Sequence, residues 1–353
     1  MPSSQLDYQD FVLRNDPKGM FALTKAFPSQ CADALRIAAT VTLPSIEPNL
    51  VVLTGLGGSA AGGDFTKALF DEFGKVSFLV NRDYQLPSFV NRETLVFVTS
   101  YSGNTEETLS AYADAMRREA MLIAVTSGGT IGKQAAVDGI PIITIPGGQP
   151  PRTALGYMLM PVIYACVELG LLPAQDWGRV IEVLEATVDL CCKPFEQNPA
   201  KQIAISLHGR LGVLYGLGNW QGIVANRWKG QLNENSKNLA LSGVFPELNH
   251  NEILGWVKAK EQGVSQFVGV LLNDGHESPK MKKRFEVTAN LVKDVCPFTS
   301  IQPLGETLLE KMLSLALLGD FVSLYLAALN DVDPENIDSI NFLKSELSNV
   351  ASV

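Results

Sequence analysis

The segment VFVTSYSGNTEET, residues 96–108, joins an apolar strand to a helix through a loop rich in hydroxyl groups. Ser100, Ser102 and Thr105 offer hydroxyl donors, and Gly103 lets the backbone turn tightly. A helix that follows such a loop points its unpaired N–H groups, the positive end of its dipole, at the same place. Because the segment contains no Lys or Arg, it predicts a specific site for a small phosphoester rather than a nucleic-acid surface.

A simpler interpretation is that these Ser and Thr residues only cap the helix, which is the commoner role of a single such residue. Glu106 and Glu107 would also favour the helix start, and they would repel an anion if they pointed inward. Three hydroxyls around one glycine favour the phosphate site.

Apolar runs of strand length alternate with segments of helical periodicity, a pattern typical of parallel sheets covered by helices. In the first half we expect strands at Leu50–Thr54, Val76–Val80, Leu95–Thr99, Leu122–Thr126 and Ile142–Ile145, and helices at Met20–Ala39, Ser59–Glu72, Asn104–Arg118 and Ile131–Val137. The sequence PGGQPPR, residues 146–152, then breaks regular structure.

After this break, an apolar helix at Leu155–Leu171 and polar helices within Trp177–Asn198 form a connector. The second half repeats the plan, with strands Leu211–Tyr215, Phe267–Leu272 and Phe298–Ile301, helices Gln221–Gln231, Met281–Lys293 and Gly305–Leu329, and a short amphipathic helix Ser339–Leu347. We therefore predict an α/β protein with two doubly wound parallel-sheet domains, residues 1–170 and 171–353.

The composition excludes several classes of protein. The chain has 353 residues and a net charge of −9, which argues against unaided binding to nucleic acid or anionic membrane. The basic run at Lys280–Arg284 is expected to be a solvated helix face. No secretion signal or long uninterrupted apolar run is visible, so we expect a cytoplasmic protein. Five scattered cysteines predict no disulfide framework, and the separated His208, His250 and His276 predict no metal site.

The sequence GLGGSAAGGD, residues 55–64, follows the first strand and superficially resembles a dinucleotide-binding fingerprint, with Ala60 in its last place. The acid expected about 20 residues later has no clear candidate, which disfavours a nicotinamide cofactor. Gly57, Gly58 and Ser59 instead allow close approach to the same phosphate, because both loops follow parallel strands. Tight packing of strand and helix would account for one or two of these glycines without any ligand.

Two segments of the second half are dense in polar residues, NENSKN at 233–238 and FPELNHNEILGW at 245–256. Glu234 and His250 are sixteen residues apart, so we expect them to meet across a loop. A Glu alone is usually solvated and a His alone is usually structural. The asparagines on both sides of each favour a hydrogen-bonded site.

Together with the loop at Ser100–Thr105, the segments GLGGSAAGGD, PGGQPPRTALGY, NENSK and FPELNHNEILGW resemble the bifunctional phosphoglucose/phosphomannose isomerases, which have tandem SIS (sugar isomerase) domains of flavodoxin-like fold. The resemblance spans the whole chain, which departs from typical members by its greater length around residues 172–200. It implies an aldose-ketose isomerase without metal or cofactor.

The resemblance also implies roles for individual residues. The sugar phosphate would be held by Gly57, Gly58, Ser59, Ser100, Ser102 and Thr105. Glu234 would be the catalytic base, and Arg152 would stabilise the enediolate. His250 would assist ring opening from the neighbouring subunit of a homodimer, and Lys344, on a C-terminal helix that returns to the active site, would lie at the ring oxygen.

These residue types suit isomerisation on chemical grounds. One carboxylate can move a proton between adjacent carbons, a permanently charged Arg can stabilise the negative charge that develops, and a neutral His can exchange a proton at the ring oxygen. Two alternatives remain: a SIS protein that binds a phosphosugar without converting it, which would usually carry a further partner domain, and a nucleotide-dependent oxidoreductase.

Overall fold

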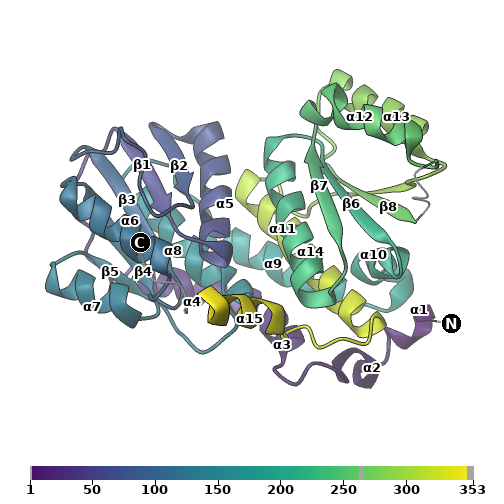
Figure 1. Cartoon of the computed structure of the whole chain (residues 1–353), viewed down its shortest axis with the longest axis horizontal. Coiled ribbons are helices and arrows are strands. Elements are labelled where there is room, and N and C mark those ends of the chain that lie inside the picture. Colours follow the sequence, from purple (N-terminus) through teal and green to yellow (C-terminus); the bar gives the residue numbers. More distant parts are fainter. Residues whose placement is uncertain (1, 262–265, 348–353) are drawn as a thin grey trace.

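The first half of the chain forms a five-stranded parallel sheet. The computed structural model describes residues 2–261 and 266–347 (Figure 1). The strands β1 (Leu50–Thr54), β2 (Ser77–Asn81), β3 (Thr94–Ser100), β4 (Met121–Thr126) and β5 (Ile142–Thr144) lie in the order β2-β1-β3-β4-β5. All seven residues of β3 are buried, as expected of a central strand between two layers of helices. This order confirms the predicted doubly wound, flavodoxin-like fold.

The second half repeats this plan with one strand fewer. Its strands β6 (Leu211–Gly216), β7 (Ala240–Val244), β8 (Phe267–Leu272) and β9 (Phe298–Ile301) are all parallel, in the order β7-β6-β8-β9. Strand β7 was not predicted, because it is an edge strand whose sequence ALSGV lacks a continuous apolar pattern. Helix α10 (Pro199–Leu207), which follows the predicted connector, was not predicted either.

The helices that follow the strands were largely predicted, with ends displaced by a few residues. In the first half they are α5 (Gly57–Phe73), α6 (Glu106–Arg117) and α7 (Gly129–Val137). In the second half they are α11 (Asn219–Ser236), α13 (Pro279–Val292) and α14 (Leu308–Leu329). Helix α11 extends five residues beyond the predicted end at Gln231 and therefore includes most of the NENSKN segment.

A layer of helices between the two sheets joins the halves into one hydrophobic core (Figure 1). It contains α4 (Phe27–Ala38), α8 (Leu155–Glu168), α9 (Trp177–Cys191) and α14, of which α4 contacts both α8 and α9. Helix α14 is long and apolar enough to cross a membrane, but 94% of its most apolar window is buried inside the protein, which identifies it as a core helix. Because this core is continuous, the domain boundary at residue 170 stays a prediction.

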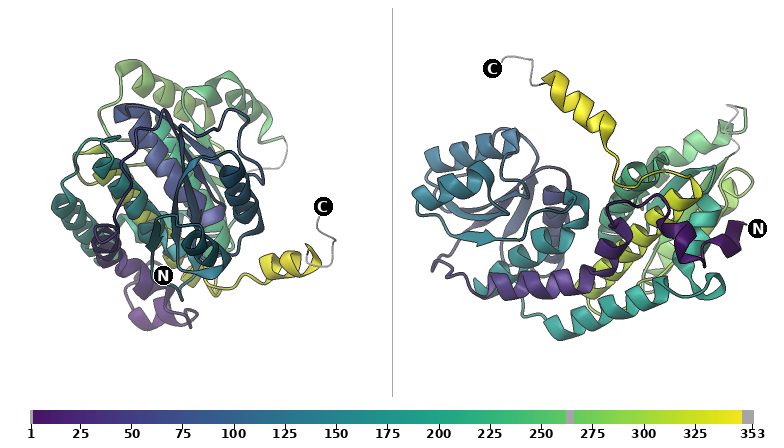
Figure 2. Two further views of the ribbon diagram at one scale, coloured as in Figure 1. Left: turned by 90° about the vertical axis from the view of Figure 1, so that its left-hand side faces the viewer. Right: turned by 90° about the horizontal axis from the view of Figure 1, so that it is seen from below.

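The two ends of the described chain lie in different places, and the N-terminal end lies beside the second half. The N-terminal helices α1 (Pro2–Gln5), α2 (Gln9–Leu13) and α3 (Met20–Lys25) pack on α10 and α14, and a salt bridge of 2.8 Å joins Asp7 to Lys201. At the other end, α15 (Asp338–Leu347) extends away from the body of the molecule (Figure 2). The loop at residues 333–336, which precedes α15, lies against both halves of the chain.

Candidate active site

Two loops meet at the carboxyl edge of the first sheet, where the order of the strands reverses. One follows β1 and begins α5, and the other follows β3 and begins α6. The Ser59 hydroxyl accepts a hydrogen bond of 3.2 Å from the Tyr101 amide, and the Thr99 hydroxyl donates to the Thr54 carbonyl at 3.1 Å. These bonds fix the loops against each other at the topological switch point, where open parallel sheets bind ligands.

The loop after β3 is organised by its own hydroxyl groups. The hydroxyls of Ser100 and Thr105 lie 3.1 Å apart, and Ser100 accepts a bond of the same length from the Gly103 amide. Gly103 has φ +67°, and a Cβ there would lie 1.9 Å from the Gly128 carbonyl oxygen, so the turn requires glycine. The Thr105 side chain makes no capping bond to α6, so simple helix capping does not explain this residue.

The two loops form a cradle that consists of Gly57, Gly58, Ser59, Ser100, Ser102 and Thr105. Arg152 lies directly beside this cradle. Its short helix η1 (Pro151–Thr153) packs so closely on α5 that a Cβ at Gly58 would lie 3.0 Å from the Pro151 carbonyl oxygen. The buried Gln30 fixes this segment by donating to the Thr153 carbonyl at 2.9 Å and accepting from the Gly156 amide at 2.8 Å. The Arg152 guanidinium is thus carried into the space between the two halves, where its side chain is only 7% exposed.

Glu234 reaches the same place from the second half. It stands in the last turn of α11, with its Oε2 3.8 Å from Nη1 of Arg152 and its side chain 41% exposed. Burial lowers the pKa of Arg152, while the charges of Glu234, Glu335 and Asp333 raise it, and a guanidinium remains protonated in such surroundings. The structure therefore brings the predicted base and the predicted cation together, although 82 positions separate them in the sequence.

Two neighbours of Glu234, Asn235 and Lys237, lie at the site although neither was predicted as a catalytic or phosphate-binding residue. Lys237 donates to the Glu234 carbonyl at 2.6 Å and to the Asn336 carbonyl at 2.9 Å, and Asn235 accepts from Arg152. Burial and then the charge of Arg152 lower the pKa of Lys237, while Asp333, Glu234 and Glu335 raise it. The polar motif NENSK is the sequence signal that could have indicated these two residues. Their contacts with Arg152 and Asn336 could not be predicted, because those partners are far away in the sequence.

His250 lies away from Glu234 within the chain, so the expectation that they meet across a loop is wrong. Glu234 stands in the last turn of α11, near the start of β7, where the Asn233 side chain accepts from the Ala240 amide at 3.1 Å. His250 ends the short helix η3 (Glu247–His250), which follows β7. The five residues of β7, a length of about 17 Å at the usual rise per residue, therefore lie between the two positions along the chain. The missed strand accounts for the error.

The remaining predicted site residue, Lys344, belongs to α15, but its side chain lies outside the described residues. In the part of the chain that the structure describes, no group of three His, Cys, Asp or Glu side chains could hold a metal ion. His208 and His276 also lie outside the site, at the end of α10 and in the loop after β8.

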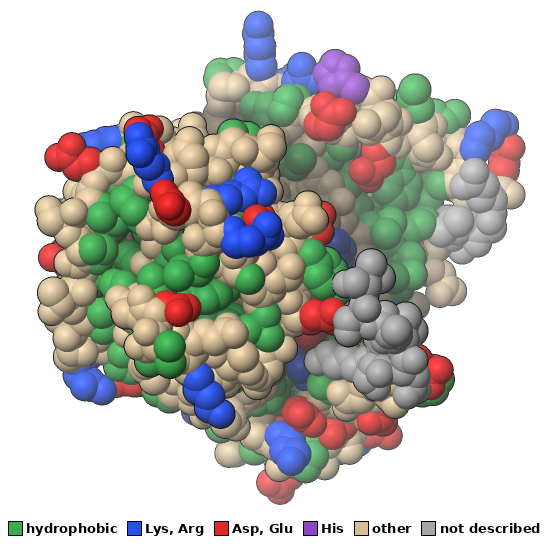
Figure 3. Space-filling model, turned by 60° about the vertical axis from the view of Figure 1, so that its left-hand side comes forward, with side chains coloured by type: hydrophobic (Ala, Val, Ile, Leu, Met, Phe, Trp, Pro, Cys, Tyr) green, Lys and Arg blue, Asp and Glu red, His purple; other side chains and the backbone are tan. Residues whose placement is uncertain are grey.

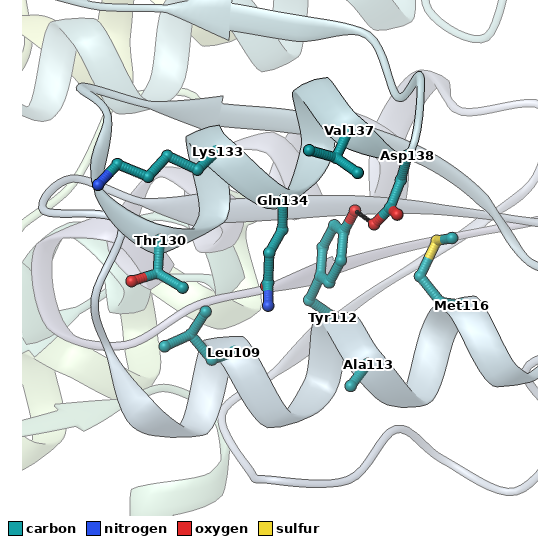
Figure 4. A pocket seen from close by; sticks show the side chains of 9 residues that line it. All are labelled: Leu109, Tyr112, Ala113, Met116, Thr130, Lys133, Gln134, Val137 and Asp138. Atoms are coloured by element: carbon teal, nitrogen blue, oxygen red, sulfur yellow. Dashed lines mark hydrogen bonds between the residues drawn. The ribbon is translucent and has the colours of Figure 1, made fainter.

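A separate groove of about 600 Å³ lies between α6 and α7 on the first half of the molecule. Hydrophobic side chains gather on this side of the surface (Figure 3). The groove is lined in part by Leu109, Met116 and Val137, and the Tyr112 hydroxyl donates to Asp138 at 2.5 Å (Figure 4). None of the cradle residues, Arg152 or Glu234 lines this groove, so it does not belong to the site.

The two parallel sheets and the cradle define a protein with tandem SIS domains. The SIS domain profile matches residues 46–146, and the profile of the bacterial phospho-glucose isomerase C-terminal SIS domain matches residues 196–347. A bifunctional phosphoglucose/phosphomannose isomerase of Caldicellulosiruptor bescii is 40% identical over 94% of this chain and 99% of its own length. That of Aquifex aeolicus is 35% identical over 84% of this chain and 90% of its own. The chain belongs to the bifunctional phosphoglucose/phosphomannose isomerase family, a family of isomerase enzymes.

The architecture is also found among solved structures. A hypothetical protein of Thermus thermophilus superposes with a TM-score of 0.75 over 97% of this chain and 93% of that chain, at 16% identity. This likeness shows a shared fold.

Proposed function

We propose that this protein interconverts glucose 6-phosphate and mannose 6-phosphate with fructose 6-phosphate through an enediol. The observation that carries the proposal is the pairing of Glu234 and Arg152, 3.8 Å apart, beside a cradle of hydroxyls and glycines. A phosphosugar sensor would need the cradle but would not need a carboxylate and a buried guanidinium facing each other.

The cradle would hold the phosphate through Gly57, Gly58, Ser59, Ser100, Ser102 and Thr105, with the N-termini of α5 and α6 directed at it. The Glu234 carboxylate would take the proton from carbon 2 of the open-chain aldose and return it to carbon 1. The hydroxyl proton would pass from oxygen 2 to oxygen 1 in the same interconversion, which yields the ketose. Negative charge develops on the two oxygens meanwhile, and Arg152 would stabilise it without competing for the proton. The step balances without an oxidant, a nicotinamide or a metal.

The same intermediate would account for two aldose substrates. Glucose and mannose 6-phosphates differ only at carbon 2, and this centre becomes planar once its proton has left. If the enediol can rotate and be reprotonated from either face, one carboxylate serves both epimers. Ring opening would use His250, with Lys344 at the ring oxygen, as the family resemblance implies.

The placement of His250 supports a homodimer. It is exposed, and β7 separates it from the Glu234 of its own chain, so it would act on a sugar ring bound beside the Glu234 of a second copy. A symmetric dimer would contain two such sites, each with Glu234 from one subunit and His250 from the other. We further propose that the enzyme acts in the cytoplasm, in glycolysis and gluconeogenesis.

Complementation between two inactive variants tests the activity and the shared site together. Fructose 6-phosphate is supplied with EDTA, and glucose 6-phosphate is detected in a separate second step. We expect turnover by the wild-type protein and near-complete loss in Glu234→Gln and His250→Ala alone. Co-expression of the two should recover about a quarter of wild-type activity, because about half of the dimers are mixed and half of the sites in a mixed dimer are intact.

The outcomes separate the two parts of the proposal. A wild-type protein that binds the sugar phosphate without turnover would be a sensor rather than an isomerase. Turnover without recovery in confirmed mixed dimers would place His250 outside the partner's site. Each variant prepared alone in the same way is the matched control.

A further inference from the structure

We propose that Asn235 is a positioning residue that fixes the Arg152 guanidinium, so that only its Nη1 edge faces the reacting carbons; this rests on the proposed function. The Asn235 Oδ1 accepts from Nε of Arg152 at 2.7 Å, and the two residues are 2% and 7% exposed. A charge-assisted bond in such a dry setting is among the stronger hydrogen bonds in proteins.

Asn235 is itself anchored on the buried helix α14. Its Nδ2 donates to the Ser323 hydroxyl at 2.9 Å, and that hydroxyl donates to the Asp320 carbonyl at 2.7 Å. Ser323 is fully buried, and Asp320 is 7% exposed. An unbroken chain of bonds therefore connects the core of the second half to an arginine that belongs to the first half.

A second route reaches the backbone of the same arginine. Arg227 donates to the Asp320 carboxylate at 2.6 Å and, through the same Nη2, to the Arg152 carbonyl at 3.4 Å. The Gln231 side chain donates a hydrogen bond to the other carboxylate oxygen of Asp320 at 2.9 Å. Arg227, Gln231 and Asn235 stand at intervals of four residues on α11, so one face of this helix holds both the main chain and the side chain of Arg152.

These bonds assign the edges of the guanidinium. The Asn235 side chain accepts a hydrogen bond from Nε of Arg152, and the Pro334 carbonyl accepts one from Nη2. Nη1 remains directed at Glu234, 3.8 Å away. Because a guanidinium is planar, fixing two of its nitrogens fixes the third, which is the edge that would meet the enediolate.

A merely structural role for Asn235, as a link between the two halves, would lower stability without a specific effect on catalysis. The positioning role instead predicts that kcat falls while substrate binding through the phosphate is kept. It also predicts that the effect of Asn235 disappears once Arg152 has lost its Nε.

The experiment is a double-mutant cycle of Asn235→Ala with Arg152→Lys, read as kcat and KM for fructose 6-phosphate. We expect Asn235→Ala to lower kcat by about tenfold to a hundredfold, as misplaced catalytic groups do, with KM within about threefold. In the Arg152→Lys background, Asn235→Ala should change kcat by less than about twofold. Ser323→Ala should act in the same direction with a smaller effect.

Asn330→Ala is the matched control, because Asn330 donates to the Ser236 carbonyl at 2.8 Å at the same end of α11 and has no bond to Arg152. It should leave kcat unchanged. Equal losses of kcat in Asn330→Ala and Asn235→Ala, or additive effects in the cycle, would overturn the positioning role.

A second measurement does not depend on turnover. The Nε–H of Arg152, assigned in NMR spectra by its loss in Arg152→Lys, should exchange slowly in the wild-type protein and in Asn330→Ala but rapidly in Asn235→Ala. Slow exchange in Asn235→Ala would refute the inference even if the wild-type protein catalyses no isomerisation. Absence of wild-type turnover alone would count only against the proposed function.

Discussion

The loop after β3 and the loop after β8 occupy the same position in the two sheets, yet their chemistry is opposite. The first contains Ser100, Ser102 and Thr105, whereas the second, residues 273–278, contains Asp274 and Glu277. In the second loop these carboxylates accept from the loop's own amides, Glu277 from Asp274 at 2.7 Å and Asp274 from His276 at 2.8 Å. Two amides of this loop, those of Asp274 and His276, therefore already donate to negatively charged carboxylates.

The same fold is thus repeated in the two halves without a repeat of the same site. Helices α5 and α11 are also counterparts, each following the first strand of its sheet. The N-terminus of α5 helps to form the cradle, whereas α11 supplies Glu234 at its C-terminus. The first half would thus provide the proposed phosphate site, and the second half provides the acidic side chain and the residues that hold Arg152.

The largest effect should come from removing the acid that the second half supplies. Glu234→Gln is expected to lower kcat at least about a thousandfold, because an amide cannot take the proton. Affinity for a phosphosugar should stay within about tenfold, since the cradle is untouched. The checks are steady-state kinetics and titration calorimetry with sorbitol 6-phosphate, which has no carbonyl group.

Glu335→Gln is the control for this variant, because the Glu335 carboxylate also acts electrostatically on Arg152 and Lys237. It should keep most of the turnover. Near-normal kcat in Glu234→Gln together with loss in Glu335→Gln would assign the base to the loop before α15 instead.

An intermediate effect should distinguish the two loops directly. Thr105→Val removes a cradle hydroxyl at nearly constant volume, and we expect KM to rise about tenfold with little change in kcat, the cost of one hydrogen bond to a charged group. Ser278→Ala alters the counterpart loop, where Ser278 caps α13 by accepting from Met281 at 3.3 Å. This variant should lose about 1 kcal/mol of stability and keep its KM. A KM effect of Ser278→Ala as large as that of Thr105→Val would contradict the assignment of phosphate binding to the first half.

Much of the fold could be predicted because buried parallel strands leave a strong signal. Strand β3 is apolar along most of its length and buried at every residue, and its predicted position at Leu95–Thr99 differs from the observed strand by one residue at each end. Strand β7 leaves no such signal, because it lies at an edge and Leu241 within it is 48% exposed. Because β7 was not predicted, the separation of Glu234 from His250 was not predicted either.

The cradle could be predicted for a related reason, since its hydroxyls and glycines lie in short segments after strands. The bonds of Arg152 could not, because its partners Asn235 and Pro334 belong to the second half and to the loop before α15. Local sequence shows which residues are polar, but only the packing of α11 against α14 shows which of them face the arginine.

The smallest effect on catalysis is expected for the contacts by which each half anchors the helix that follows its loop, because these contacts act on stability. On α6, the buried Asp114 carboxylate accepts from the Leu86 amide at 3.0 Å and pairs with Arg118 at 2.8 Å. The counterpart helix α13 has a pair between Lys283 and Glu286 whose side chains are both more than 60% exposed. Asp114→Asn should therefore lower the free energy of unfolding by about 1–3 kcal/mol at pH 7, whereas Glu286→Gln should change it by less than about 0.5 kcal/mol.

The pH dependence of protein stability should show whether Asp114 anchors α6 through its charge. Burial alone would raise the pKa of Asp114, but the Arg118 hydrogen bond, the Leu86 amide and the charges of Arg118 and Arg117 outweigh it and lower this pKa. A lowered pKa in the folded protein stabilises it fully above the unfolded value near 4, and this stabilisation is lost as the pH falls through the folded value. Urea unfolding at pH 7 and pH 3 should show the difference between wild type and Asp114→Asn shrinking at the lower pH. A difference that stays constant or grows would mean that Asp114 does not anchor α6 through its charge.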